Sequence, residues 1–122
     1  MPVAPTPDVY DELVSPSNAA IDRWNAAADV VDLVGIRRVS GELASLLEEF
    51  AAGVQGLDWP ADARPHAQAL VAGLALEVAW YRGVASCADD GATVAALEEP
   101  WSDQAVEAAA LLREALGAAA LA

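Results

Sequence analysis

Apolar residues recur at spacings of three and four along most of this chain, and alanine supplies a large share of them. This spacing is typical of helices with one buried face, because successive residues advance by about 100° around the helix axis. Aromatic residues make up only 6% of the chain and β-branched residues are scattered, so strand propensity is poor throughout. The pattern predicts an all-α protein, and 122 residues suffice for one domain with a single core.

The first helix is predicted to begin near Ser15, which can act as N-cap, with Pro16 in the first helical position. The preceding residues begin with the proline-spaced sequence PVAPTP. Residues 1–14 are therefore predicted to form an N-terminal tether or a short helical lead-in. Gly35 is predicted to end the first helix, after a buried stripe that includes Val31.

The next two helices have clearer boundaries in the sequence. One is predicted from about Ser40 to Gln55, after which the pair Trp59-Pro60 favours an extended connection. The other is predicted from about Ala61 to Ala88 and carries the widest apolar face of the chain. Short connections of this kind favour antiparallel neighbours in a bundle.

The last helical segment contains Pro100, which allows two interpretations. Apolar residues keep the helical spacing straight through the proline, which favours one kinked helix that begins at Thr93. Alternatively, Ser102 caps a fresh helix behind a separate helical turn. The sequence predicts an antiparallel up-down-up-down four-helix bundle over residues 15–117, with the last helix kinked or broken at Pro100. Gly117 is expected to end regular structure, and an apolar C-terminal tail follows at 118–122.

The balance of charge narrows the classes of partner. Nineteen acidic residues stand against six basic ones, which gives a formal net charge of −13. Such a surface repels nucleic acid and anionic lipid headgroups. No apolar run in the sequence approaches the roughly 18 to 20 residues that cross a bilayer. The sequence therefore predicts neither a nucleic-acid partner nor a transmembrane segment.

The sequence lacks the usual motifs of catalysis, metal binding and cofactor binding. It has no Gly-rich phosphate loop, no Cys-x-x-Cys and no Glu-x-x-His pair. Its one histidine, His66, and its one cysteine, Cys87, are about 21 residues apart, too far along a helix to act as base and nucleophile. We therefore expect no catalytic residues, no metal ligands and no cofactor.

Glu77 is the one polar residue clearly inside the apolar face of the third helix. Burial of a lone carboxylate is costly, so such a group normally has a partner or is protonated. The structural interpretation is an ion pair or hydrogen bond to another helix, with Arg23, Arg113 or Asn25 as partner. The functional interpretation is that Glu77 binds a ligand.

The functional interpretation places a pocket between the third helix and the last one. Trp80, Tyr81 and Trp101 would line it around Glu77, with the break at Pro100 making room. Its ligand would be small and either apolar or cationic. The ordinary interpretation is that these aromatic residues are core anchors.

Two stretches of the chain resemble a known group of proteins. They read NAAIDRWNAA at residues 18–27 and LDWPADARPHAQALVAGL at residues 57–74, where the Trp-Pro-Ala-Asp junction is most distinctive. They are similar to small Ala-rich helical proteins of the secreted or lipoprotein type, of unknown function, from high-GC Gram-positive bacteria. The resemblance covers about residues 16–116. It implies an extracytoplasmic domain, secreted or lipid-anchored to the cell surface, and it carries no catalytic residue.

Three hypotheses of function follow from these observations. The leading one is a non-enzymatic extracytoplasmic module that binds a ligand or a protein partner. The second is a small-molecule-binding protein or small helical enzyme with a pocket around Glu77. The third is a structural bundle that self-associates, as a homodimer, through its last helix. The chain begins at Met1 without a signal segment, so a native start there would instead predict a cytoplasmic protein.

Overall fold

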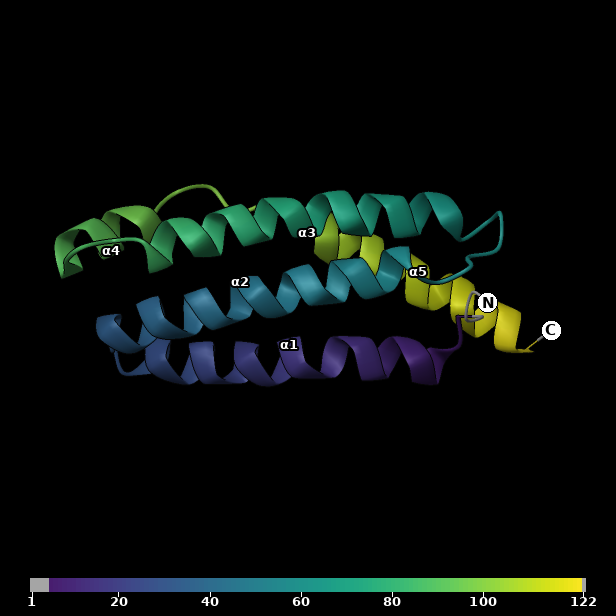
Figure 1. Ribbon diagram of the computed structural model, residues 1–122, viewed down its shortest axis with the longest axis horizontal. Helices are drawn as coiled ribbons and strands as arrows, with labels where there is room; N and C mark the ends of the chain where they lie inside the picture. Colours follow the sequence, from purple (N-terminus) through teal and green to yellow (C-terminus); the bar gives the residue numbers. More distant parts are fainter. Residues whose placement is uncertain (1–4, 122) are drawn as a thin grey trace.

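Five helices pack as an up-down bundle in the part of the chain that the computed structural model describes, residues 5–121. They are α1 (Pro7–Asp29), α2 (Leu33–Gln55), α3 (Arg64–Ala85), α4 (Asp90–Leu97) and α5 (Gln104–Leu121). Long neighbouring helices run antiparallel, and the end of α5 lies at the same end of the bundle as the start of α1 (Figure 1). The all-α prediction and the up-down arrangement are confirmed. The short α4 lies where the alternative interpretation of the last segment placed a separate helical turn.

The start of α1 lies at Pro7, well before the predicted start at Ser15. The hydroxyl of Thr6 accepts a hydrogen bond from the backbone N–H of Val9 at 3.2 Å. Pro7 occupies the first helical position, where its missing N–H leaves no bond unmade. Because this Thr-Pro start comes first, Pro16 lies inside the helix, and most of the residues assigned to a tether or lead-in are helical.

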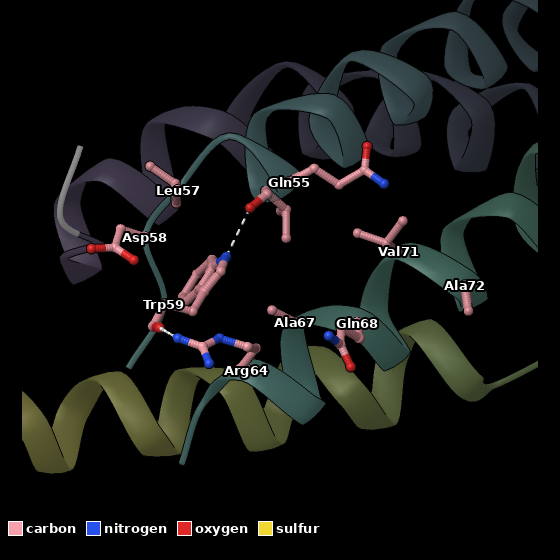
Figure 2. Close-up of a pocket in the computed structure, with 10 residues that line it drawn as sticks. Gln55, Leu57, Asp58, Trp59, Arg64, Ala67, Gln68, Val71 and Ala72 are labelled. Atoms are coloured by element: carbon pink, nitrogen blue, oxygen red, sulfur yellow. Dashed lines mark hydrogen bonds between the residues drawn. The ribbon is translucent and has the colours of Figure 1, made fainter. Parts of the chain in front are cut away.

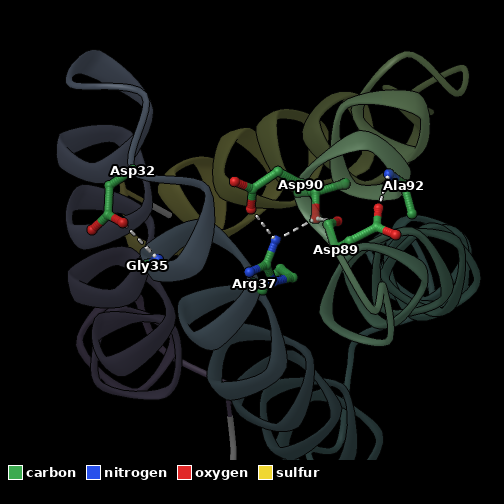
Figure 3. A network of polar contacts seen from close by, with 7 residues as sticks. Asp32, Gly35, Arg37, Asp89, Asp90 and Ala92 are labelled. Atoms are coloured by element: carbon green, nitrogen blue, oxygen red, sulfur yellow. Dashed lines mark hydrogen bonds and ion pairs between the residues drawn. The ribbon is translucent and has the colours of Figure 1, made fainter.

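The boundary between α1 and α2 also differs from the prediction. α1 ends at Asp29 and α2 begins four residues later, so Gly35 ends no helix and the predicted start at Ser40 is late. Asp32 caps α2 by accepting a hydrogen bond from the N–H of Gly35 at 3.0 Å (Figure 3). A Cβ on Gly35 would lie 2.3 Å from the Asp32 carboxylate, so this glycine makes room for the cap. Val31 makes the turn with φ of 52°, and its side chain is 71% exposed rather than buried.

A network of polar contacts holds α4 against α2 (Figure 3). The guanidinium of Arg37 donates to the carboxylate of Asp90 at 2.9 Å and to the hydroxyl of Thr93 at 2.8 Å. Asp89 caps α4 by accepting a hydrogen bond from the N–H of Ala92 at 2.8 Å. These contacts fix α4 as a separate element at the end of the bundle where α1 turns into α2.

Pro100 separates α4 from α5, so the single kinked helix predicted from Thr93 is wrong. A proline inside a helix removes one backbone hydrogen bond and crowds the preceding turn. The alternative of a fresh helix is the one observed, with the hydroxyl of Ser102 3.3 Å from the N–H of Gln104. At its other end α5 passes through Gly117, so residues 118–121 of the predicted tail are helical, and residue 122 lies outside the described part.

The bundle has two halves because α5 begins beside the middle of α3 (Figure 1). The two helices are closest at Gly73, where a Cβ would lie 2.5 Å from the backbone nitrogen of Ala105. From there α5 runs along the first half of α3, and we call this region, with its alanine-rich α5, the alanine half. Along the second half of α3 the α4–α5 connection takes the place of a helix. This region, which contains Trp101, is called the aromatic half.

Candidate functional site

Three of the four residues predicted to form a site pack on one another in the aromatic half. The ring centroids of Trp80 and Trp101 are 5.1 Å apart, and Tyr81 lies 5.3 Å from Trp80 and 5.4 Å from Trp101. Trp24 of α1 completes the cluster, 6.2 Å from Tyr81. The indole N–H groups of Trp24 and Trp80 have acceptors at 2.9 and 3.1 Å. The four rings therefore pack on one another in this half, where Trp24 and Trp80 are hydrogen-bonded and Trp101 is 38% exposed.

Glu77 lies one helical turn before Tyr81, at the boundary between the two halves. Its side chain is 9% exposed, and no ion pair joins its carboxylate to any described residue. Arg23 is paired with Glu42 at 2.6 Å, and Asn25 is exposed on α1. The predicted partners on α1 are thus directed elsewhere, and Glu77 is a buried carboxyl without a counter-charge.

The lack of a partner changes the titration of Glu77. Burial raises the pKa of its carboxyl from 4.5 to about 7. Burial also raises the pKa of Tyr81 to about 12, with the negative charge of Glu77 as a second cause, so this phenol stays neutral. α1 and α2 contribute no charged side chain to the cavity beside Glu77, and α5 contributes Arg113 alone. At neutral pH, Glu77 is therefore a mixture of carboxyl and carboxylate.

A cavity of about 280 Å³ opens beside Glu77 between α1 and α5. Its floor is apolar and comes from α2 and α3, which contribute Leu47, Phe50, Leu70 and Leu74. α5 forms one wall largely from small side chains, Ala105, Ala109 and Ala110. The space exists because α1 and α5 touch little, in contrast to the close packing of α2 on α3. Trp80, Tyr81 and Trp101 do not line this cavity, so the structure separates Glu77's cavity from the aromatic cluster.

Two further polar groups at the cavity wall have no partner among the described residues. The hydroxyl oxygens of Tyr10 and Ser17 are buried without a hydrogen bond. The guanidinium carbon of Arg113 lies 5.4 Å from the ring centroid of Tyr10, over the face of the ring. Burial raises the pKa of the Tyr10 hydroxyl, and Arg113 opposes that rise because its charge and its N–H groups lie near this hydroxyl, although not in hydrogen-bond geometry. Buried polar groups are normally hydrogen-bonded, so these hydroxyls and the Glu77 carboxyl leave unused hydrogen-bonding capacity at one wall of the cavity.

A larger cavity, of about 470 Å³, lies where α2 passes into α3 (Figure 2). The indole of Trp59 and the guanidinium of Arg64 in its lining are hydrogen-bonded within the protein. The indole N–H of Trp59 donates to the carbonyl of Val54 at 2.7 Å, and Arg64 donates to the carbonyl of Trp59 at 3.0 Å. The amides of Gln55 and Gln68 at its edge are exposed to water. Despite its volume this cavity carries no buried group that lacks a partner, and the cavity beside Glu77 is the stronger candidate.

The sequence pointed to Glu77 but did not single out Tyr10, which falls in the segment predicted to be a tether or a short helical lead-in. The signal that would have placed it in the bundle is the Thr6-Pro7 pair, which combines an N-cap with a proline in the first helical position. In the described residues there is no group of three or more side chains suited to hold a metal ion. No helix within residues 5–121 has the length and apolar character required to span a membrane.

Comparisons of this chain with protein-family models, curated proteins and solved structures found no match. The resemblance to secreted or lipoprotein-type helical proteins therefore stays a prediction. The cavity beside Glu77 combines an ionisable carboxyl, an apolar floor and an alanine wall.

Proposed function

We propose that this protein is a non-enzymatic binding module that holds a small amphipathic amine in the cavity between α1 and α5. The observation that carries the proposal is the buried Glu77 at the cavity wall, which no described residue pairs with. A protonated amine would supply the missing counter-charge and hydrogen-bond donors, because an ionised carboxylate only accepts hydrogen bonds. The leucine floor and the alanine wall would cover the apolar part of the ligand.

Charge and size both support a small cation. The formal net charge of −13 attracts cations and repels anions around the whole molecule. The cavity, at about 280 Å³, lies near the lower end of the roughly 300 to 1,000 Å³ typical of ligand sites. The ligand is therefore a short chain or a single ring that bears an amine, rather than a large cofactor.

Calorimetric titration with octylamine at pH 8 tests this proposal. Glu77→Gln should weaken binding at least tenfold, because a charge-assisted hydrogen bond contributes about 1.5 to 3 kcal/mol. Glu49→Gln is the matched control, since Glu49 is exposed on α2 and should leave octylamine binding unchanged. Octanol has the same chain without the charge and should bind wild type much more weakly. Equal binding of octanol and octylamine would contradict the proposal.

The pH dependence of the affinity gives a second test of the same site. The amine binds the carboxylate form, and the pKa of Glu77 is raised to about 7. Below that pH, the carboxyl must release a proton before it pairs with the amine, so affinity should fall about tenfold for each pH unit. Tyr81 does not titrate in this range, because its pKa is raised to about 12. An affinity that is constant between pH 5 and 8 would exclude Glu77 as the binding group.

A self-associating bundle is the second candidate, and it is favoured by two exposed side chains on α5. Leu111 is 47% exposed, and Val106, which also lines the cavity, is 59% exposed. Light scattering at high concentration separates the candidates. A dimer that Leu111→Glu converts to monomers would support self-association, whereas monomers at every concentration would exclude it.

The extracytoplasmic address is also part of this proposal, and it rests on the resemblance. Fractionation of cells that express the native gene tests it. We expect the protein in the medium or at the cell surface, and recovery in the cytosol alone would contradict export.

A further inference from the structure

Glu77 and Arg113 lie toward opposite ends of the cavity between α1 and α5. The contact between Gly73 and Ala105 gives the register of α3 against α5. Glu77 is four residues past Gly73, and Arg113 is eight residues past Ala105, in opposite directions because the helices are antiparallel. At a rise of 1.5 Å per residue, their Cα atoms are about 18 Å apart along the bundle.

The ordinary tilt of helical side chains directs both Glu77 and Arg113 toward the space between them. A helical side chain tilts toward the N-terminus of its own helix. For Glu77 this direction leads toward Leu74 and Leu70 of the cavity floor, and for Arg113 it leads toward Ala110 and Ala109 of the wall. Given the reach of the two side chains, their charged groups are on the order of 10 Å apart, with apolar lining between them.

Arg113 is the one arginine that lines this cavity, and its position suits an anion. Three other arginines, Arg23, Arg37 and Arg82, each form an ion pair with a carboxylate, whereas no described residue forms one with Arg113. The guanidinium instead lies over the ring of Tyr10, and the side chain of Arg113 is exposed, so those of its five N–H donors that do not face Tyr10 are open to a ligand. A ligand that extends from Glu77 along the cavity would meet this positive charge at its far end.

We infer that the ligand is bifunctional, with an amine at Glu77, an apolar spacer over the leucine floor, and an anionic group at Arg113. This inference rests on the proposed function, because the amine end defines where the ligand lies. The overall negative charge of the protein disfavours anions elsewhere on its surface. The chemical class is therefore an elongated amino acid with its two charges at opposite ends of the molecule.

Three probes of the same chain length test the inference by calorimetry at pH 8: octylamine, octanoate and 8-aminooctanoate. Wild type should bind 8-aminooctanoate about fivefold more tightly than octylamine, an increment that fits a partly exposed ion pair. Arg113→Gln should remove that advantage and leave octylamine binding unchanged or slightly stronger. Arg113→Lys keeps the charge and should retain most of the advantage. Arg38→Gln, which removes an exposed arginine of α2, is the matched control.

The outcomes separate this inference from the proposed function. If octylamine binds through Glu77 and 8-aminooctanoate binds no more tightly, the inference is wrong and the proposed function stands. If Arg113→Gln weakens both amines equally, Arg113 has only a structural role, which also overturns the inference. If neither amine binds wild type, both proposals fall. Melting curves followed by circular dichroism confirm that each variant is folded in the titrations.

Discussion

The aromatic half and the alanine half share helices α1, α2 and α3, yet they are filled in opposite ways. In the aromatic half, four large rings pack with centroids 5.1 to 6.3 Å apart. In the alanine half, small side chains of α5 leave about 280 Å³ open beside Glu77. Polar groups follow the same division, since the half-buried indoles of Trp24 and Trp80 have acceptors, whereas the buried hydroxyls of Tyr10 and Ser17 have no hydrogen-bond partner among the described residues. The comparison indicates that one half is filled by its own side chains, whereas the other leaves open the volume to which our proposal assigns a ligand.

The largest expected effect comes from breaking the aromatic half. Trp80→Ala removes contacts with three rings and the hydrogen bond from its indole to the carbonyl of Glu99 at 3.1 Å. We expect a loss of about 3 kcal/mol in the free energy of unfolding, measured in urea. Leu76→Ala is the control, because this neighbour on α3 is 50% exposed and should cost well under half as much. Similar losses for the two variants would contradict a stabilising role for the cluster.

The second prediction concerns Glu77 and the dependence of stability on pH. The unfolded chain releases this proton near pH 4.5, whereas the folded state keeps it until about pH 7. The folded state therefore loses stability as the pH rises from 4.5 through 7, by about 3 kcal/mol at most, with little further loss above. Glu77→Gln has no such titration. The free energy of unfolding of Glu77→Gln, measured in urea, should equal that of wild type near pH 4.5. At pH 8 it should be larger by about 1 to 3 kcal/mol.

The quantity to compare is the difference in the free energy of unfolding between wild type and Glu77→Gln, because all the other carboxyl groups are common to both proteins. Glu49→Gln provides the matched control, since an exposed carboxyl should give a difference that is small at every pH. A Glu77→Gln variant that is less stable than wild type at pH 8 would show that Glu77 has a cationic partner. That result would also remove the basis for a ligand at this position.

The third prediction concerns a substitution, Gly73→Ala, that should force α5 away from α3. Gly73→Ala places a Cβ 2.5 Å from the backbone nitrogen and 2.8 Å from the Cα of Ala105, and backbone atoms cannot rotate out of the way. We expect a loss of about 2 kcal/mol, because overpacking of this kind typically costs about 1 to 3 kcal/mol. Gly83→Ala is the control on the same helix, since a Cβ there meets nothing within 4 Å. It should stabilise the protein by up to about 1 kcal/mol, and equal losses for the two variants would contradict the close approach at Gly73.

Helical periodicity predicted the buried face of α3 well, but local capping chemistry decided where helices begin and end. Leu70, Leu74 and Val78 are buried as the pattern requires, and so is the exceptional Glu77. The boundaries were wrong where two start signals competed. Thr6-Pro7 prevails over Ser15-Pro16 at the start of α1, and the Asp32 cap sets the start of α2. A side-chain cap depends on local backbone geometry that residue spacing does not reveal.

The cavity could not be predicted, because it depends on the register of α5 rather than on any single helix. Pro100 breaks the predicted helix, and the contact between Gly73 and Ala105 then sets where α5 lies on α3. Only that placement separates Glu77 from Trp101 and brings Arg113 into the same cavity. The sequence showed that Glu77 is a polar residue on an apolar helix face, but the groups that surround it depend on tertiary packing.

The last prediction concerns a substitution that fills part of the open volume in the alanine half, so that its packing becomes closer to that of the aromatic half. Ala109 is partly buried at the cavity wall, so Ala109→Leu adds three carbons where space already exists. Burial of about one or two of these groups should stabilise the fold by about 1 kcal/mol, at roughly 0.8 kcal/mol for each. The same side chain should abolish octylamine binding, whereas Ala79→Leu, on the exposed face of α3, should leave binding unchanged. Stabilisation combined with loss of binding would show that the open volume serves the ligand at the expense of stability. Stabilisation with binding intact would place the ligand elsewhere on the protein.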